Sequence, residues 1–260
     1  MMKRILLVVI GLLGVQLSAG LAWGQQWGHL SARFVFDGTP PKPVPTVVTK
    51  DQAVCGKFKL VDETLVVNSR NRGIANVIVF LRDTKKPAIH PDYEKSLKEK
   101  VLLNNINCRF EPRVALIRTG QALVLGNKDP VGHNTKIDTF FNPGVNPLIP
   151  SGAQLDQKFM IEERLPARVS CSIHPWMGAW LVIRSNPYFA ASDADGKIHI
   201  KNIPAGTWEF QFWQEKSGYV RSVTVGGKKT EWKRGRVDLK IPSGKTLDLG
   251  DVVVDKKLFQ

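Results

Sequence analysis

Short apolar runs, each bounded by turn residues, recur along most of this chain and constrain its fold more than any other feature. The runs are rich in β-branched and aromatic residues, and turn-forming pairs such as Asp195-Gly196 and Gly226-Gly227 separate some of them. Short strands at this spacing are typical of an all-β sandwich or barrel. The strands that we expect are 29–36, 65–67, 74–81, 114–117, 122–125, 157–161, 167–171, 179–183, 197–200, 208–213, 219–225, 237–241 and 246–254.

Two segments depart from this pattern. Residues 91–101 place Tyr93, Leu97 and Val101 at helical spacing among charges of both signs, which predicts one short helix. Residues 140–152 contain three prolines and two glycines, which prevent regular strand pairing. We therefore expect a loop there with an unusual number of apolar side chains.

The first 24 residues resemble a secretory signal. A basic start with Lys3 and Arg4 precedes an apolar stretch, and small residues follow at Ala22 and Gly24. We expect cleavage and a periplasmic or secreted protein. The alternative is a single uncleaved N-terminal anchor, because the apolar stretch approaches the length that spans a bilayer. No later stretch is apolar for that length, so we expect no membrane span in the mature chain.

The charge of the chain limits its partners. Lys and Arg number 37 against 23 Asp and Glu, a net charge of +14 at pH 7. In a cytosolic protein this excess would suggest nucleic acid. Because we expect export, we predict no nucleic-acid partner and favour an acidic protein or an anionic surface, reached through long-range steering. The densest basic run, 228–236, is more typical of a solvated hairpin than of a docking site.

One group of side chains has the composition of a metal site. Cys171, His174 and Met177 follow one another at a spacing of three, and His133 with Asn134 lies upstream. A thiolate and two imidazoles in one plane, with a weakly bound thioether, suit copper that cycles between Cu(I) and Cu(II). Each residue alone would more often be an ordinary core or surface residue, but the combination indicates one copper ion.

These residues resemble the cupredoxin family of blue copper proteins. The loop from Cys171 to Met177 is similar to the short ligand loop of amicyanins, whereas plastocyanin-like loops carry more residues between histidine and methionine. The similarity covers residues 105–186 or so and implies a Greek-key β-sandwich or barrel. It implies that His133, Cys171 and His174 are the equatorial ligands of the copper and Met177 the axial one.

The resemblance also implies roles around the ligands. Asn134 is expected to hydrogen-bond to the region of Ser172 and so to tie the two ligand segments together. The edge of His174 is expected to reach the surface and to serve as the electron port. The proline-rich loop of residues 140–152 departs from the family's pattern.

The remaining cysteines point to a disulfide. Three cysteines allow one bridge and one working thiol. With Cys171 assigned to the metal, Cys55 and Cys108 can pair in an oxidising compartment. The alternative is two unpaired buried thiols.

The C-terminal part is similar to carboxypeptidase-regulatory-like (transthyretin-like) β-sandwiches, which often carry an Asp-Gly turn, a strand, Pro-x-Gly and an aromatic strand. Residues 189–210 show this order, and residues 28–37 and 73–81 look like the opening strands of the same module. Whether these strands complete the C-terminal sandwich stays open. The expected organisation is a signal peptide (1–24), an N-terminal β region (25–100), a cupredoxin domain (101–187) and a second β-sandwich (188–260).

The function that we expect is one-electron transfer between redox partners, with an acidic c-type cytochrome or dehydrogenase as the partner. We do not expect an enzyme, because oxidase or nitrite-reductase chemistry would need a second copper site and only His29, His90 and His199 remain for it. The alternatives are a copper storage or delivery protein, and an envelope interaction module without metal.

Overall fold

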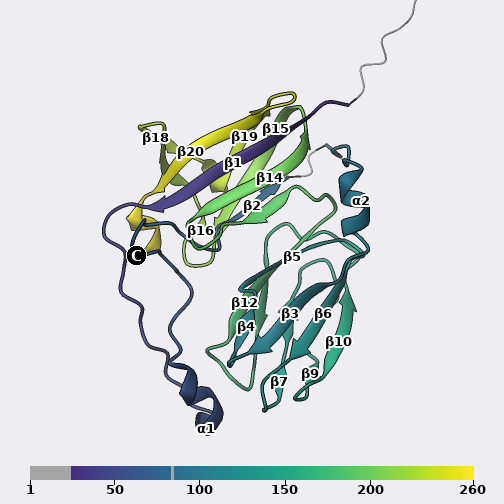
Figure 1. Cartoon of the computed structure of the whole chain (residues 1–260), viewed down its shortest axis with the longest axis vertical. Coiled ribbons are helices and arrows are strands. Elements are labelled where there is room, and N and C mark those ends of the chain that lie inside the picture. The colour runs from purple at the N-terminus through teal and green to yellow at the C-terminus, as the bar shows by residue number, and fades with distance from the viewer. Residues whose placement is uncertain (1–24, 83–84) are drawn as a thin grey trace, which may run out of the picture.

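The structure is a computed structural model that describes residues 25–82 and 85–260, so the expected signal peptide lies outside the described residues. Regular structure in this part of the chain is almost entirely β-strand, arranged as two sandwiches that lie one beside the other (Figure 1). The prediction of an all-β sandwich fold is confirmed. Among the described residues, no helix is long and apolar enough to cross a membrane.

The first sandwich takes strands from both ends of the chain, and we call it the split sandwich. Its two sheets have the strand orders β14-β1-β20-β17-β18 and β13-β2-β15-β16, and β19 pairs with β15. The strands are β1 (Trp27–Phe36), β2 (Ile78–Leu81), β13 (Phe189–Ala191), β14 (Lys197–Pro204), β15 (Gly206–Gln214), β16 (Gly218–Tyr219), β17 (Ser222–Val225), β18 (Lys228–Glu231), β19 (Arg236–Ile241) and β20 (Thr246–Val254).

Strand β1 lies inside its sheet, between β14 and β20. Its side chains alternate, so that Leu30 and Phe34 are fully buried in the core while Ser31 and Arg33 face outward. Arg33 pairs with Asp251 of β20. The N-terminal strand is thus part of the same hydrophobic core as the C-terminal strands.

The second sandwich is inserted between β2 and β13, and we call it the inserted sandwich. Its sheets have the strand orders β10-β6-β3-β4 and β5-β12-β11-β8, with a short β7-β9 pair at one end. The strands are β3 (Val101–Ile106), β4 (Arg109–Glu111), β5 (Val114–Arg118), β6 (Ala122–Asn127), β7 (His133–Asn134), β8 (Lys136–Asp138), β9 (Leu148–Ile149), β10 (Gln154–Lys158), β11 (Ala167–Ser170) and β12 (Gly178–Arg184).

A small apolar cluster joins the two sandwiches. Val114 and Val182 of the inserted sandwich pack there with Phe80 and Trp213 of the split sandwich. Beside it, Arg113 donates to both carboxylate oxygens of Glu215, at 2.9 and 2.8 Å.

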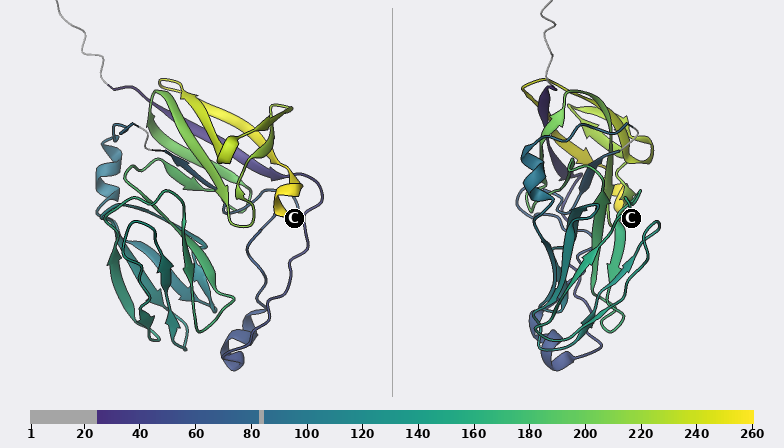
Figure 2. Two further views of the ribbon diagram at one scale, coloured as in Figure 1. Left: turned by 180° about the vertical axis from the view of Figure 1, so that it is seen from behind. Right: turned by 90° about the vertical axis from the view of Figure 1, so that its right-hand side faces the viewer.

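A long arm, residues 37–72, leaves the end of β1, reaches the far end of the inserted sandwich and returns (Figure 2). Its two limbs are joined by backbone hydrogen bonds between Thr46 and Leu60 and between Asp62 and Val44. Its tip holds α1 (Gln52–Cys55) and the 3-10 helix η1 (Gly56–Phe58). Cys55 forms a disulfide with Cys108 of the inserted sandwich, which confirms the predicted bridge.

Several predicted elements differ in extent. The helix expected over 91–101 is only α2 (Asp92–Ser96), because Val101 already begins β3, where parallel pairing with β6 outweighs the helical pattern. Residues 65–67 form a single bridge from Val67 to Ile74 instead of a strand. The strand expected over 157–161 begins earlier and ends at Lys158. Two further 3-10 turns are η2 (Lys233–Gly235) and η3 (Lys256–Phe259).

Candidate metal centre

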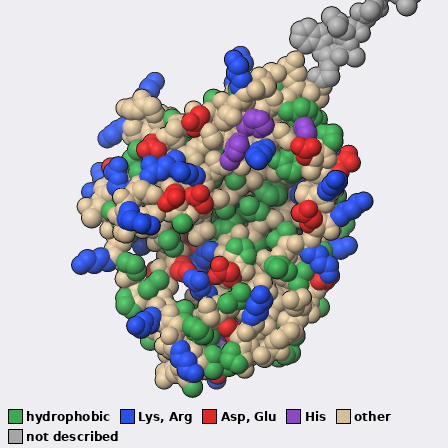
Figure 3. All heavy atoms as spheres, viewed as in Figure 1, with side chains coloured by type: hydrophobic (Ala, Val, Ile, Leu, Met, Phe, Trp, Pro, Cys, Tyr) green, Lys and Arg blue, Asp and Glu red, His purple; other side chains and the backbone are tan. Residues whose placement is uncertain are grey.

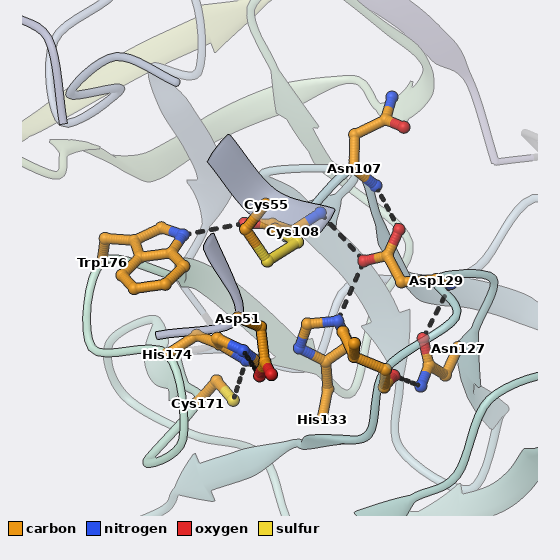
Figure 4. Close-up of a disulfide and its surroundings, with 11 residues drawn as sticks. Asp51, Cys55, Asn107, Cys108, Asn127, Asp129, His133, Cys171, His174 and Trp176 are labelled. Atoms are coloured by element: carbon orange, nitrogen blue, oxygen red, sulfur yellow. Dashed lines mark hydrogen bonds and ion pairs between the residues drawn. A yellow bond between two sulfur atoms is a disulfide. The ribbon is translucent and has the colours of Figure 1, made fainter. Parts of the chain in front are cut away.

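His133, Cys171 and His174 converge at the end of the inserted sandwich that carries β7 (Figure 4). One nitrogen of each histidine and the sulfur of Cys171 all lie within 4.8 Å of one another. The three side chains are almost completely buried, with 0, 2 and 0 % exposed. Met177 is also buried, in the same hydrophobic core as Cys171.

The loop that carries most of these side chains is short and closed. It connects β11 to β12, which are paired up to Ser170 and Gly178. Within it the backbone N–H of Met177 donates to the carbonyl of His174 at 2.9 Å, and the N–H of Cys171 donates to the carbonyl of Met177 at 3.4 Å. The antiparallel pairing of the flanking strands therefore fixes the start and end of the loop.

His133 is oriented by a buried carboxylate. Its Nε2 lies 2.9 Å from Oδ2 of Asp129, a carboxylate that also accepts the backbone N–H groups of Asn107 and Cys108, at 2.6 and 2.8 Å. Because a carboxylate only accepts, Nε2 carries a proton, and in the neutral ring Nδ1 then keeps its lone pair. That Nδ1 is buried with no hydrogen-bond partner. A buried ring nitrogen without a partner is costly in either protonation state, so this atom fits a metal ligand.

His174 is oriented in the same way by a residue from the arm. Its Nε2 lies 2.8 Å from Oδ2 of Asp51, and its Nδ1 lies 3.7 Å from Sγ of Cys171. The expectation that the edge of His174 reaches the surface is wrong, because the arm covers it and the ring is 0 % exposed.

Asn134 joins the two segments that supply these side chains. Its Oδ1 accepts the backbone N–H of Ser172 at 2.8 Å and lies 3.3 Å from Sγ of Cys171. Its Nδ2 lies 3.4 Å from Oγ of Ser172. The structure therefore contains the contact between Asn134 and Ser172 that the resemblance implied.

Electrostatics favour a thiolate beside at least one neutral imidazole. Burial acts to raise the pKa of Cys171, but the neighbouring His133 and backbone N–H groups outweigh it and lower that pKa. Burial acts to lower the pKa of His133, but Asp129 and Cys171 together raise it to about 9. Burial and the neighbouring His133 lower the pKa of His174 despite Asp51. The thiolate is the form of cysteine that binds metals.

The other ionisable clusters are weaker candidates. Cys108, Asp129 and His133 also lie close together, but the sulfur of Cys108 is already in the disulfide. His29, His90 and His199 belong to the split sandwich or lie against it, and Figure 3 shows histidine side chains on its surface. Among residues 25–82 and 85–260, these three histidines take part in no group of metal-ligand geometry.

Sequence reasoning did not identify Asp129 or Asp51. Asp129 precedes His133 by four positions, and this short spacing is a signal that could have identified it. Asp51 is 123 positions from His174, and nothing in the local sequence connects them.

A comparison with known proteins found similarity only to solved structures. No family model and no curated protein matches the chain. The purple cupredoxin from Nitrosopumilus maritimus is 21% identical over 33% of this chain and 99% of its own, with a TM-score of 0.28. A point mutant of amicyanin in its reduced Cu(I) form is 13% identical over 41% of this chain and 98% of its own, with a TM-score of 0.30.

A third likeness is to the copper-containing nitrite reductase from Thermus scotoductus SA-01. It is 18% identical over 40% of this chain, with a TM-score of 0.30, and the match spans 25% of the reductase. Because these TM-scores are low, we base the function on the geometry of the centre itself.

Proposed function

We propose that this protein binds one copper ion and carries single electrons between redox partners. One observation carries the proposal: two imidazole nitrogens and one cysteine sulfur converge in a buried pocket, while the other nitrogen of each ring is held by a carboxylate. This donor set suits copper in both oxidation states, and copper supplies the one-electron couple when bound. His133, Cys171 and His174 are the proposed equatorial ligands and Met177 the axial one.

The surrounding residues support fast electron transfer because they hold the ligands in place before metal arrives. Asp129 and Asp51 each hold one imidazole by its outer nitrogen, and Asn134 joins the two ligand segments. Ligands held in this way need little rearrangement when the charge of the metal changes. The carboxylates and the thiolate also offset the positive charge of a bound ion.

Within this proposal, the inserted sandwich is a cupredoxin domain (101–187). The split sandwich is a transthyretin-like module formed by residues 188–260 with strands from the N-terminal β region (25–100). The disulfide supports an oxidising compartment. We therefore propose a periplasmic or secreted protein whose residues 1–24 are removed as a signal peptide.

The proposed redox partner is an acidic protein, such as a c-type cytochrome or a dehydrogenase. The net charge of +14, which becomes +12 when Lys3 and Arg4 are removed with residues 1–24, supports this choice, and Figure 3 shows Lys and Arg side chains spread over the visible face. Electron exchange with such a partner should slow as salt increases, because screening weakens long-range attraction. Rates that do not change with salt would exclude electrostatic steering.

A visible spectrum recorded after loading with Cu(II), before and after ascorbate, tests the copper centre. We expect an intense thiolate-to-copper absorption band that disappears on reduction and returns on reoxidation. Cys171→Ser should lack the band, because the sulfur that produces it is gone. A wild-type protein that binds Cu(II) without this band would contradict the proposed ligand set.

A second candidate, copper storage or delivery, is favoured by one observation. The ligand side chains are almost fully buried, and Asp51 covers the outer nitrogen of His174. Binding of Cu(I) alone, without the absorption band and without reversible one-electron reduction, would support that function. Failure to bind copper in either state would leave a metal-free interaction module.

A further inference from the structure

The arm reaches the proposed copper centre through a single carboxylate. Oδ2 of Asp51 lies 2.8 Å from Nε2 of His174, and Figure 4 shows the two side chains next to each other. The side chain of Asp51 is 34% exposed, whereas that of His174 is 0 % exposed. The carboxylate therefore stands between the imidazole and solvent.

This contact determines which nitrogen of His174 is available to a metal. Because the carboxylate can only accept, Nε2 must carry a proton, and in the neutral ring Nδ1 then keeps its lone pair. Nδ1 is the nitrogen that lies 3.7 Å from Sγ of Cys171. A carboxylate that accepts from Nε2 also makes Nδ1 more basic and therefore a stronger metal ligand.

Asp51 lies one helical turn from the disulfide. The backbone N–H of Cys55 donates to the carbonyl of Asp51 at 2.8 Å, so the two residues belong to the same turn. Asp51 itself has a left-handed backbone conformation (φ 47°), which a non-glycine residue keeps only when its surroundings hold it. Cys55 is bonded to Cys108, which fixes this turn to the inserted sandwich.

Behind the tip, the arm is not packed continuously against the sandwich. A cavity of about 390 Å³ lies between them, lined by residues of both parts, including Phe58 and Leu60 of the arm and Trp176 of the ligand loop. Val48 and Val54 contact the core of the inserted sandwich at the tip. The arm is also held by ion pairs of Glu63 with Arg109 and Arg113 of the inserted sandwich, and the disulfide is its covalent attachment at the tip.

The disulfide lies between the two carboxylates that hold the histidines. On one side, the backbone N–H of Cys108 donates to Asp129, which holds His133. On the other side, Cys55 shares a turn with Asp51, which holds His174. The two sides differ, because Asp129 and Cys108 both belong to the inserted sandwich, whereas Asp51 belongs to the arm, which the disulfide bonds to that sandwich.

We propose that Asp51 is a positioning residue for His174 and that the Cys55–Cys108 disulfide places it. The inference rests on the proposed function in taking His174 as a copper ligand. It goes further because it says that the arm, a segment outside the inserted sandwich, orients this ligand and covers its outer edge. A redox partner approaching His174 would meet the arm, not the imidazole.

The test begins with the metal-free protein, where copper chemistry cannot interfere. Nitrogen-15 NMR of the histidine rings reports which nitrogen carries the proton. In the wild type, His174 should be protonated at Nε2, and in Asp51→Ala this preference should be lost. Asp51→Asn, which keeps an acceptor oxygen, should restore part of it. The matched control is Asp62→Asn, an arm carboxylate that accepts from Thr64 and should leave the His174 signals unchanged.

The disulfide is tested with the Cys55→Ser/Cys108→Ser double variant. Its His174 signals should resemble those of Asp51→Ala, while His133 should keep its proton on Nε2. Copper affinity, measured by competition with a chelator, should fall roughly 10- to 100-fold in Asp51→Ala. The same assay should show no fall in Asp62→Asn.

Two results would overturn the inference. If Asp51→Ala keeps the His174 tautomer of the wild type, Asp51 is not a positioning residue. If the double cysteine variant keeps it, the disulfide does not place Asp51. A wild type that binds no copper would refute the proposed function instead, and the metal-free spectra would still decide the role of Asp51.

Discussion

Asn134 and Ser172 join two segments that are far apart in the chain: Oδ1 of Asn134 accepts the backbone N–H of Ser172 at 2.8 Å. The same oxygen lies 3.3 Å from Sγ of Cys171. Asn134 follows His133 in β7, and Ser172 follows Cys171 in the ligand loop. This hydrogen bond therefore holds the two proposed ligands close to each other.

Asn134→Ala should weaken the centre more than Ser172→Ala. The first change leaves a half-buried backbone N–H without its acceptor, which costs about 1–3 kcal/mol of unfolding free energy. It should lower copper affinity by roughly 10- to 100-fold. Ser172→Ala keeps the backbone N–H and loses only a 3.4 Å contact, so it serves as the control. Urea unfolding and chelator competition measure both effects, and equal effects of the two variants would contradict this role.

Removing the disulfide should destabilise the fold. The bridge closes a loop with a sequence separation of 53, and the chain-entropy estimate for such a loop is about 4 kcal/mol. The Cys55→Ser/Cys108→Ser variant should therefore unfold at clearly lower urea concentration than wild type, both without metal. Cys171→Ser, which leaves the bridge intact, is the control. A loss of unfolding free energy below about 1 kcal/mol would show that the arm remains ordered in the unfolded ensemble or that the bridge contributes little to stability.

Glu163→Ala should loosen the proline-rich loop. The buried carboxylate of Glu163 accepts the backbone N–H groups of Phe140, Phe141 and Asn142, at 2.9–3.1 Å. Leaving such donors without an acceptor costs about 1–3 kcal/mol, and amide hydrogen exchange at residues 140–142 should accelerate. Glu231→Ala, at an exposed position of β18, should change stability by less than about 0.5 kcal/mol. Unchanged exchange in Glu163→Ala would contradict the assigned anchoring role.

Arg113 and Glu215 should couple the two sandwiches energetically. The two side chains are largely shielded from solvent, with 12 and 16% exposed. A double-mutant cycle with Arg113→Met and Glu215→Gln should give a coupling energy of about 1–3 kcal/mol. The pair Lys136–Asp138 is exposed and should give less than about 1 kcal/mol. Coupling energies that are alike for the two pairs would show that Arg113 and Glu215 add no more stability than an exposed pair.

Sequence patterns predicted the elements whose signals are local. The alternation of β1 and the run of β12 reflect which face each residue buries, so their positions followed from the sequence. β3 was missed, because Val101, its first residue, fits the helical spacing of Tyr93 and Leu97 as well as a strand, and only parallel pairing with β6 selects the strand. β9 was also missed, since its two residues lie between Pro147 and Pro150 and gain their order from β7.

The sequence by itself determined the all-β class and the set of side chains that converge at the proposed copper centre. It could do so because Cys171, His174 and Met177 lie in one hairpin connection, where residues that are close in the chain are also close in space. Only the tertiary structure decided how the histidines are held. Asp51 meets His174 through an arm that leaves one sandwich and touches the other, and such a contact has no local sequence pattern. The same contact decided that the edge of His174 is covered, because burial depends on what packs above a residue.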